Sequence, residues 1–224
     1  MDIRSFKPAS ALAGRFGVKS LVYGPPGTGK TPIVNTAPRP CLMVVEPGML
    51  SMRSSNVPAF EAYTYAAINE FVQWLFNSAE TRNFDTVGID SISQMAEIIL
   101  TAKLAVNKDG RKAYGEMSRE VMTIVNGLYF LPQKHVYLIA KETHIEMAGT
   151  NIRRPYFPGQ DLNVKVPHLY DLIMRIAPAI VAPGQTHIAF QTSGTFDVMA
   201  RDRSGRLAAY EPLDLNALFT KAMS

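Results

Sequence analysis

The chain has 224 residues, of which 47% are hydrophobic and 19% charged, and its formal net charge is +4. This length suits one domain with a buried core, and the composition excludes the disordered and fibrous classes. The start, MDIRSFKPAS, lacks the apolar core of a signal peptide, and no run of about eighteen apolar residues occurs. We therefore expect a cytoplasmic protein without a membrane partner. The mild basic excess permits contact with polyanions but is also common in proteins that touch none.

Four apolar runs that end in polar residues predict buried parallel strands, because such strands deliver their carboxyl ends to a site. They cover residues 17–24, 41–48, 86–91 and 135–142. The single cysteine, Cys41, begins the apolar run CLMVV and is expected to be a buried thiol, which excludes an internal disulfide and suits a reducing compartment.

Helical periodicity separates the predicted strands. One apolar face comprises Ile68, Phe71, Val72, Leu75 and Phe76, and another comprises Met117, Val121, Ile124, Val125 and Leu128. Strands alternating with helices predict an α/β fold with a mostly parallel central sheet flanked by helices.

The last third of the chain differs in composition from the residues before it. Residues 143–167 are polar with Gly and Pro, and strands are expected near 172–181, 187–192 and 195–200, the first being an edge or broken strand because it contains Pro178. A final helix has Leu215, Leu218, Phe219 and Ala222 on one side. We expect a single domain with a lead-in (1–16), a core (17–182), and C-terminal antiparallel strands with the final helix (183–224).

The segment GPPGTGKT matches the phosphate-binding P-loop pattern and follows a predicted strand. Gly27 and Gly29 allow the backbone to approach phosphates, Lys30 should reach the β- and γ-phosphates, and Thr31 should hold Mg²⁺. The residues expected to contact ATP are Gly24, Pro25, Pro26, Gly27, Thr28, Gly29, Lys30 and Thr31. A helix that begins here would add its dipole, although Pro38 and Pro40 should end it early. The alternative is a glycine-rich turn without a ligand.

Two carboxylates complete the predicted site. Asp90 ends a predicted strand and suits a second Mg²⁺ ligand, with the N-cap of the next helix as its alternative role. Glu46 ends the strand after the P-loop and suits a catalytic base that orients water, with a solvated strand end as the alternative.

The spelling GPPGTGKT is typical of AAA+ ATPases, in which Glu usually follows the strand-ending Asp, whereas this chain has Ser91. With Glu46 as the base, the chain resembles RecA-like P-loop ATPases. Residues 153–176 and 201–219 are similar to those of phage RecA-like nucleotide-binding proteins, including single-strand annealing ATPases. That resemblance implies ATP hydrolysis, assembly into a ring or filament, and work on single-stranded DNA in a bacterial host, alongside a phage single-strand binding protein.

The resemblance also implies further site residues. A sensor would lie at Lys141, although the family prefers a neutral amide there, and a cation completing a neighbour's site would be Lys165 or Arg175. Loops that contact DNA would span residues 105–119, with Lys108, Arg111, Lys112 and Arg119, and residues 143–159, with Arg153 and Arg154. Tyr114, Tyr156 and Phe157 add rings that stack on bases. The alternative for the two DNA-binding segments is that they are solvated surface loops. The alternative for Lys165 and Arg175 is a surface position or a salt bridge within the chain.

The leading hypothesis is a Mg²⁺-dependent ATPase that acts on single-stranded DNA in phage recombination or replication. The first rival is a nucleotide-gated protein-binding module with little ATP turnover. The second is an AAA+ remodeller, which the absence of Glu after Asp90 and of a helical lid segment disfavours.

Overall fold

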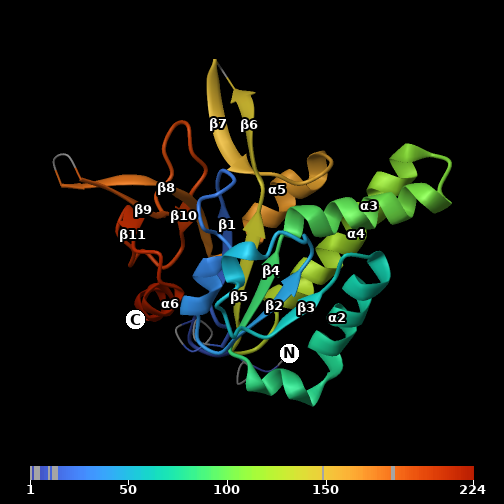
Figure 1. Cartoon of the computed structure of the whole chain (residues 1–224), viewed down its shortest axis with the longest axis horizontal. Helices are drawn as coiled ribbons and strands as arrows, with labels where there is room; N and C mark the ends of the chain where they lie inside the picture. The colour runs from blue at the N-terminus through green and yellow to red at the C-terminus, as the bar shows by residue number, and fades with distance from the viewer. Residues whose placement is uncertain (1, 3–5, 10, 12–14, 148, 183–184) are drawn as a thin grey trace.

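The computed structural model describes residues 2, 6–9, 11, 15–147, 149–182 and 185–224. Its central sheet contains β1 (Lys19–Tyr23), β2 (Pro40–Val44), β3 (Ala59–Glu61), β4 (Thr86–Asp90), β5 (His135–Ala140), β8 (Leu172–Ala182), β9 (Gln185–Gln191), β10 (Arg201–Asp202) and β11 (Tyr210–Glu211). The strand order is β11-β9-β8-β1-β5-β4-β2-β3, and β10 pairs with β8 (Figure 1).

The sheet is parallel from β8 to β3 and antiparallel at β9, β10 and β11. The mostly parallel core with antiparallel C-terminal strands is therefore confirmed, and the four predicted runs are β1, β2, β4 and β5. Because parallel strands deliver their carboxyl ends to one edge, the loops after these four strands meet there.

The helices are α2 (Tyr65–Asn77), α3 (Ile92–Val106), α4 (Gly110–Tyr129), α5 (Gln160–Leu169) and α6 (Leu215–Met223), with short 3₁₀ segments η2 (Pro32–Thr36), η3 (Leu50–Met52) and η4 (Ala79–Asn83). Alternating strand residues feed two cores. Leu21 and Met43 pack with α2, α3 and α4 on one face of the sheet, whereas Val22 and Leu42 pack with η2 and α6 on the other. This two-sided burial explains why the strands are continuous apolar runs.

The predicted helical faces are largely buried. The five apolar residues expected on α4 are all buried, as are Leu215, Leu218 and Phe219 of α6. On α2, Ile68, Phe71 and Leu75 are buried, but Phe76 is 38% exposed and lies outside the core. Cys41 is buried as predicted, and burial raises the pKa of its thiol to about 12.

The polar segment 143–167 is more regular than its composition predicts. It contains the hairpin of β6 (Glu142–Met147) and β7 (Thr150–Pro155), followed by α5, and the hairpin projects from the top of the molecule in Figure 1. Most hairpin residues are exposed or half-buried, so no alternation of apolar residues marks these strands.

Two other expectations concern the C-terminal strands. The strand expected at 195–200 is wrong, because these residues form only isolated bridges and the chain re-enters the sheet at β10. The expectation of an edge or broken strand at 172–181 is also wrong, because β8 is continuous and lies between β9 and β1. Pro178 is tolerated there because β8 has by then passed the end of β1 and pairs only with β9.

Of the expected lead-in, residues 1, 3–5, 10 and 12–14 lie outside the described part of the chain. None of the helices formed by the described residues is long and apolar enough to cross a membrane.

Candidate nucleotide-binding site

The P-loop joins β1 to η2 at the carboxyl edge of the sheet. Gly27 and Gly29 have φ of 78° and 83°, a conformation that L-residues with a side chain adopt only under strain, and no heavy atom lies within 4 Å of the position of a Cβ at either. The loop therefore has the backbone form and the open space that phosphate oxygens need.

The segment after the loop is short, as predicted, but it is a five-residue 3₁₀ helix rather than an α-helix. Ala37 is its C-cap, Pro38 comes next, and the chain extends into β2 at Pro40. A helix with so few aligned peptide units has a small dipole, and its expected contribution to phosphate binding is therefore reduced. The N–H groups of the loop and Lys30 are left as the main groups that bind phosphate.

Lys30 turns back over its own loop. Its Nζ donates hydrogen bonds to the carbonyl oxygens of Gly24 at 2.8 Å and Pro25 at 2.7 Å. Burial lowers the pKa of Lys30, and the carboxylates of Asp90, Glu142 and Glu46 act in the opposite direction. The buried Tyr137 hydroxyl donates to the Lys30 carbonyl at 2.8 Å and fixes the backbone at this residue.

Thr31 and Asp90 lie in contact, with the Thr31 hydroxyl donating to the Asp90 carboxylate. Burial raises the pKa of Asp90, a trend that the Thr31 hydrogen bond opposes. The N-cap of α3 is Ser91, whose Oγ accepts from the Gln94 N–H at 3.1 Å, so the alternative capping role does not fall to Asp90. A hydroxyl and a carboxylate side by side are the oxygen donors that Mg²⁺ prefers.

Glu46 follows β2 and reaches across to Ser91. The Ser91 hydroxyl donates to Glu46 Oε1 at 2.6 Å, and Ser91 is only 3% exposed. Sequence reasoning treated Ser91 only as the position of a missing Glu, whereas the structure makes it the residue that holds Glu46. The sole sequence signal for this contact was a serine directly after the strand-ending Asp90.

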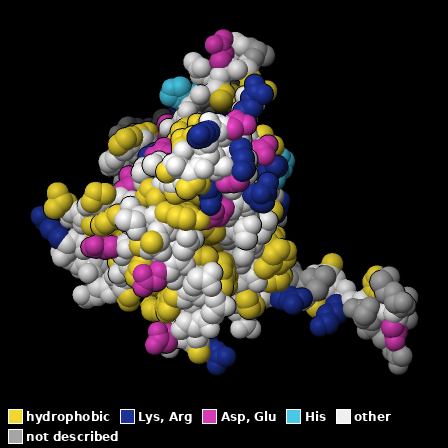
Figure 2. Space-filling model, turned by 90° about the vertical axis from the view of Figure 1, so that its right-hand side faces the viewer, with side chains coloured by type: hydrophobic (Ala, Val, Ile, Leu, Met, Phe, Trp, Pro, Cys, Tyr) yellow, Lys and Arg dark blue, Asp and Glu magenta, His cyan; other side chains and the backbone are white. Residues whose placement is uncertain are grey.

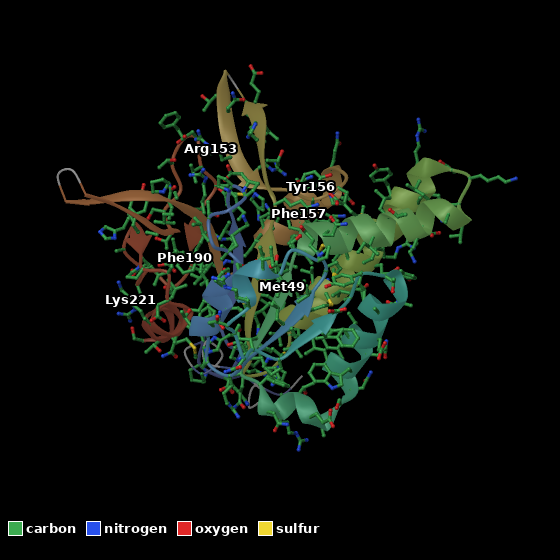
Figure 3. All side chains as sticks on the ribbon, viewed as in Figure 1. Met49, Arg153, Tyr156, Phe157, Phe190 and Lys221 are labelled. Carbon is green, nitrogen blue, oxygen red and sulfur yellow. The ribbon has the colours of Figure 1, made fainter. Side chains whose placement is uncertain are left out.

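These groups surround a cavity of about 450 Å³. Its walls include Lys30, Thr31, Glu46, Asp90, Ser91 and Glu142, and Met49, which is labelled in Figure 3. One cavity therefore combines the P-loop, a pair of oxygen donors for a metal ion, and a positioned carboxylate. The residues present fit a nucleotide with Mg²⁺.

The three other cations expected near the site each have a partner within the chain. Lys141 lines the cavity, but its Nζ donates to Gln94 at 2.7 Å and Glu97 at 2.9 Å on α3. Arg175 forms an ion pair with Glu142, and Lys165 is exposed on α5 beside Asp161 at 2.6 Å.

The basic residues expected to contact DNA have different surroundings. Lys108 lies in the α3–α4 turn, whereas Arg111, Lys112 and Arg119 lie on α4, so most of the expected loop 105–119 is helical. All four are exposed. Figure 2 shows the side of the molecule that lies on the right in Figure 1, and Lys and Arg side chains occur on its upper part with Asp and Glu among them.

The second group is less accessible. Arg153 forms an ion pair with Asp197, and Arg154 is buried with a nitrogen donating to the Asn163 carbonyl at 2.9 Å (Figure 3 labels Arg153). Phe157 is fully buried in the core, where its ring has no face for a base, while Tyr156 is half-buried.

A protein-family profile described as an AAA domain matches residues 17–204, which include the whole site. The chain belongs to this AAA domain family. The match begins just before β1 and extends past β10, so the AAA domain includes the P-loop, Glu46, Asp90 and the β6–β7 hairpin. Membership makes the chain a P-loop ATPase-type protein with a nucleotide-binding fold.

Solved structures show distant likeness. The KaiC-like protein PH0186 from Pyrococcus horikoshii OT3 is 14% identical with a TM-score of 0.43, covering 78% of this chain and 77% of its own. The flagellar accessory protein FlaH from Methanocaldococcus jannaschii is 10% identical with a TM-score of 0.42, covering 79% of this chain and 78% of its own. No curated protein sequence matches significantly.

Proposed function

We propose that this AAA domain protein is a Mg²⁺-dependent ATPase. One observation carries the proposal: the Thr31–Asp90 pair and the Ser91–Glu46 pair lie around the same cavity as Lys30. The first pair offers oxygen ligands to a metal ion, the second offers an oriented carboxylate, and Lys30 supplies positive charge for phosphate.

The chain's own groups divide the work. The N–H groups of the P-loop and the ammonium of Lys30 bind and orient the phosphates, after Lys30 exchanges the carbonyls of Gly24 and Pro25 for phosphate oxygens. Thr31 and Asp90 would hold Mg²⁺, which would neutralise charge on those oxygens. Glu46, held by Ser91, accepts a hydrogen bond from the attacking water and takes its proton.

The direct test measures ATP binding by calorimetry and phosphate release, each with and without Mg²⁺. The wild-type protein should bind ATP, and it should release phosphate only when Mg²⁺ is present. Lys30→Ala should lose both ATP binding and phosphate release, because the loop loses its cation. Binding without turnover would instead favour the nucleotide-gated binding module. No binding by the wild-type protein would contradict the proposal.

We further propose that the ATPase assembles on single-stranded DNA during phage recombination or replication. Support comes from the resemblance to phage RecA-like ATPases and from exposed cations in the α3–α4 turn and the first half of α4, namely Lys108, Arg111, Lys112 and Arg119. Cations on one projecting element suit a strand of phosphates bound without base reading.

Turnover and sedimentation with and without oligo(dT) test this second part. DNA should stimulate ATP turnover and promote assembly, and replacement of Lys108, Arg111 and Lys112 by Gln should weaken binding and flatten its salt dependence. The matched control replaces Arg39, an exposed cation paired with Asp85, by Gln. Turnover and assembly that ignore DNA would contradict this part alone.

A further inference from the structure

The ion pair between Glu142 and Arg175 lies beside the P-loop. Arg175 Nε is 2.7 Å from Glu142 Oε2, and Arg175 Nη2 is 3.4 Å from Oε1, so two guanidinium nitrogens face the carboxylate. The two side chains are 14% and 13% exposed. Charges this far removed from water depend on each other, and a group that separates them must offer one of them a new partner.

The pair extends over the start of the P-loop from both sides of β1. Arg175 lies on β8 directly opposite Tyr23, the residue before the loop, and a Cβ on Gly24 would lie 3.1 Å from the Ile176 carbonyl oxygen. Glu142 comes from the other side, just after β5, and lines the nucleotide cavity. Glu142 is the member of the pair that lines the cavity, and Arg175 adjoins the same chain's site through this ion pair.

The charge balance of the cavity makes the pair sensitive to phosphate. Glu46, Asp90 and Glu142 all place carboxylates in its walls. Burial lowers the pKa of Lys30, and the Glu142 carboxylate is close enough to oppose that shift. A nucleotide adds negative charge, which repels the Glu142 carboxylate and attracts the Arg175 guanidinium, and a planar guanidinium binds phosphate oxygens as readily as it binds a carboxylate.

We propose that Arg175 recognises the terminal phosphate of a nucleotide bound in its own subunit, and that Glu142 is the partner it leaves to do so. The inference rests on the proposed function, since it requires ATP in this cavity. Arg175 then distinguishes a triphosphate from a diphosphate. Glu142 competes with the terminal phosphate for the guanidinium and binds it in the empty and ADP-bound states.

The exchange has a structural consequence, because Glu142 is the first residue of β6. Loss of its ion pair frees the base of the projecting hairpin (Figure 1). The hairpin keeps other contacts near the site, among them the Tyr23 hydroxyl, which donates to the carbonyl of Arg153 on β7 at 3.0 Å. The terminal phosphate thus changes the attachment at the base of β6 and leaves those of β7, which include the ion pair of Arg153 with Asp197, in place.

Competition predicts effects of opposite sign for the two partners. Glu142→Gln removes the competitor, so the ratio of ATP-analogue to ADP affinity should rise about fivefold. Arg175→Gln removes the recognising group, so the same ratio should fall about fivefold or more. A purely structural ion pair would weaken both nucleotides equally in both variants.

The experiment measures the affinities of a non-hydrolysable ATP analogue and of ADP by calorimetry, with Mg²⁺. Glu120→Gln is the matched control, because Glu120 forms a comparable pair with Lys103, at 2.6 Å with side chains 23% and 18% exposed, between α3 and α4. Arg175→Lys, which keeps the charge without the planar fork, covers the case in which Arg175→Gln does not fold, and it should lower the ratio by a smaller factor.

Hydrogen exchange in β6 and β7 provides the second readout. The analogue should increase exchange at the start of β6 relative to ADP in the wild-type protein, and Glu142→Gln should show the increase with either nucleotide. Affinity ratios equal to that of the control, or equal exchange with both nucleotides, would overturn the inference. Failure of the wild-type protein to bind either nucleotide would instead overturn the proposed function.

Discussion

Replacing Ser91 with Ala removes two interactions of one hydroxyl. The hydroxyl donates to Glu46 at 2.6 Å and accepts the Gln94 N–H at the start of α3. Loss of the N-cap costs about 1 kcal/mol of stability. A hydrogen bond to a charged group contributes about 1.5–3 kcal/mol, and if all of it serves to orient the base, its loss slows turnover by about 10- to 100-fold.

Two further substitutions separate these roles. Ser91→Gly also removes the hydroxyl, but glycine is tolerated at an N-cap. It should therefore lower turnover as much as Ser91→Ala does, while costing only a few tenths of a kcal/mol of stability. Ser91→Thr keeps the hydroxyl and should retain much of the turnover. The assays are phosphate release at saturating ATP and chemical denaturation of each variant.

Turnover is the deciding quantity for Ser91. If Ser91→Ala folds and hydrolyses ATP at the wild-type rate, the Ser91–Glu46 contact does not position the base. A loss of ATP affinity with unchanged turnover would contradict the reasoning equally, because Glu46 is expected to act on water and not on binding.

Three other substitutions test different parts of the account. Burial lowers the pKa of His135 from 6.5 to about 4, and its neutral Nδ1 accepts the Val18 N–H at 3.1 Å. The unfolded chain therefore takes up a proton first as the pH falls, and up to about 3 kcal/mol of stability is lost between pH 6.5 and 4. Denaturation across this range should show a smaller loss for His135→Asn, which keeps an acceptor, and equal losses would refute the assignment. Asp90→Asn should raise the Mg²⁺ concentration needed for tight ATP binding, as calorimetry with a Mg²⁺ series would show, and an unchanged midpoint would exclude Asp90 as a ligand. Gly29→Ala, at φ of 83°, should lower stability by about 1–2 kcal/mol and weaken ATP binding, and unchanged thermal unfolding and affinity would show that the loop tolerates a side chain there.

Local patterns were sufficient for the core of the fold. The apolar runs predicted β1, β2, β4 and β5 because burial on both faces of a parallel sheet favours apolar residues at most positions. The glycine pattern likewise predicted the loop, since Gly27 and Gly29 meet a backbone requirement that is local.

Contacts between distant residues were not predictable in this way. Ser91 is 45 residues from Glu46, and Arg175 is 33 from Glu142, so neither contact leaves a periodic signal. The same reason explains Phe157, which lies in a polar segment but packs in the core because α5 follows it and covers it. The hairpin was missed because its strands face solvent and carry no alternation of apolar residues.

The central claim, that a P-loop site with Glu46 as its base hydrolyses ATP, is tested most directly by Glu46→Gln. Glutamine keeps the size of the side chain and can still accept the Ser91 hydrogen bond, but it cannot take a proton from water. The account predicts wild-type ATP affinity with turnover reduced by about 100-fold or more. Normal turnover in a folded Glu46→Gln protein would contradict it.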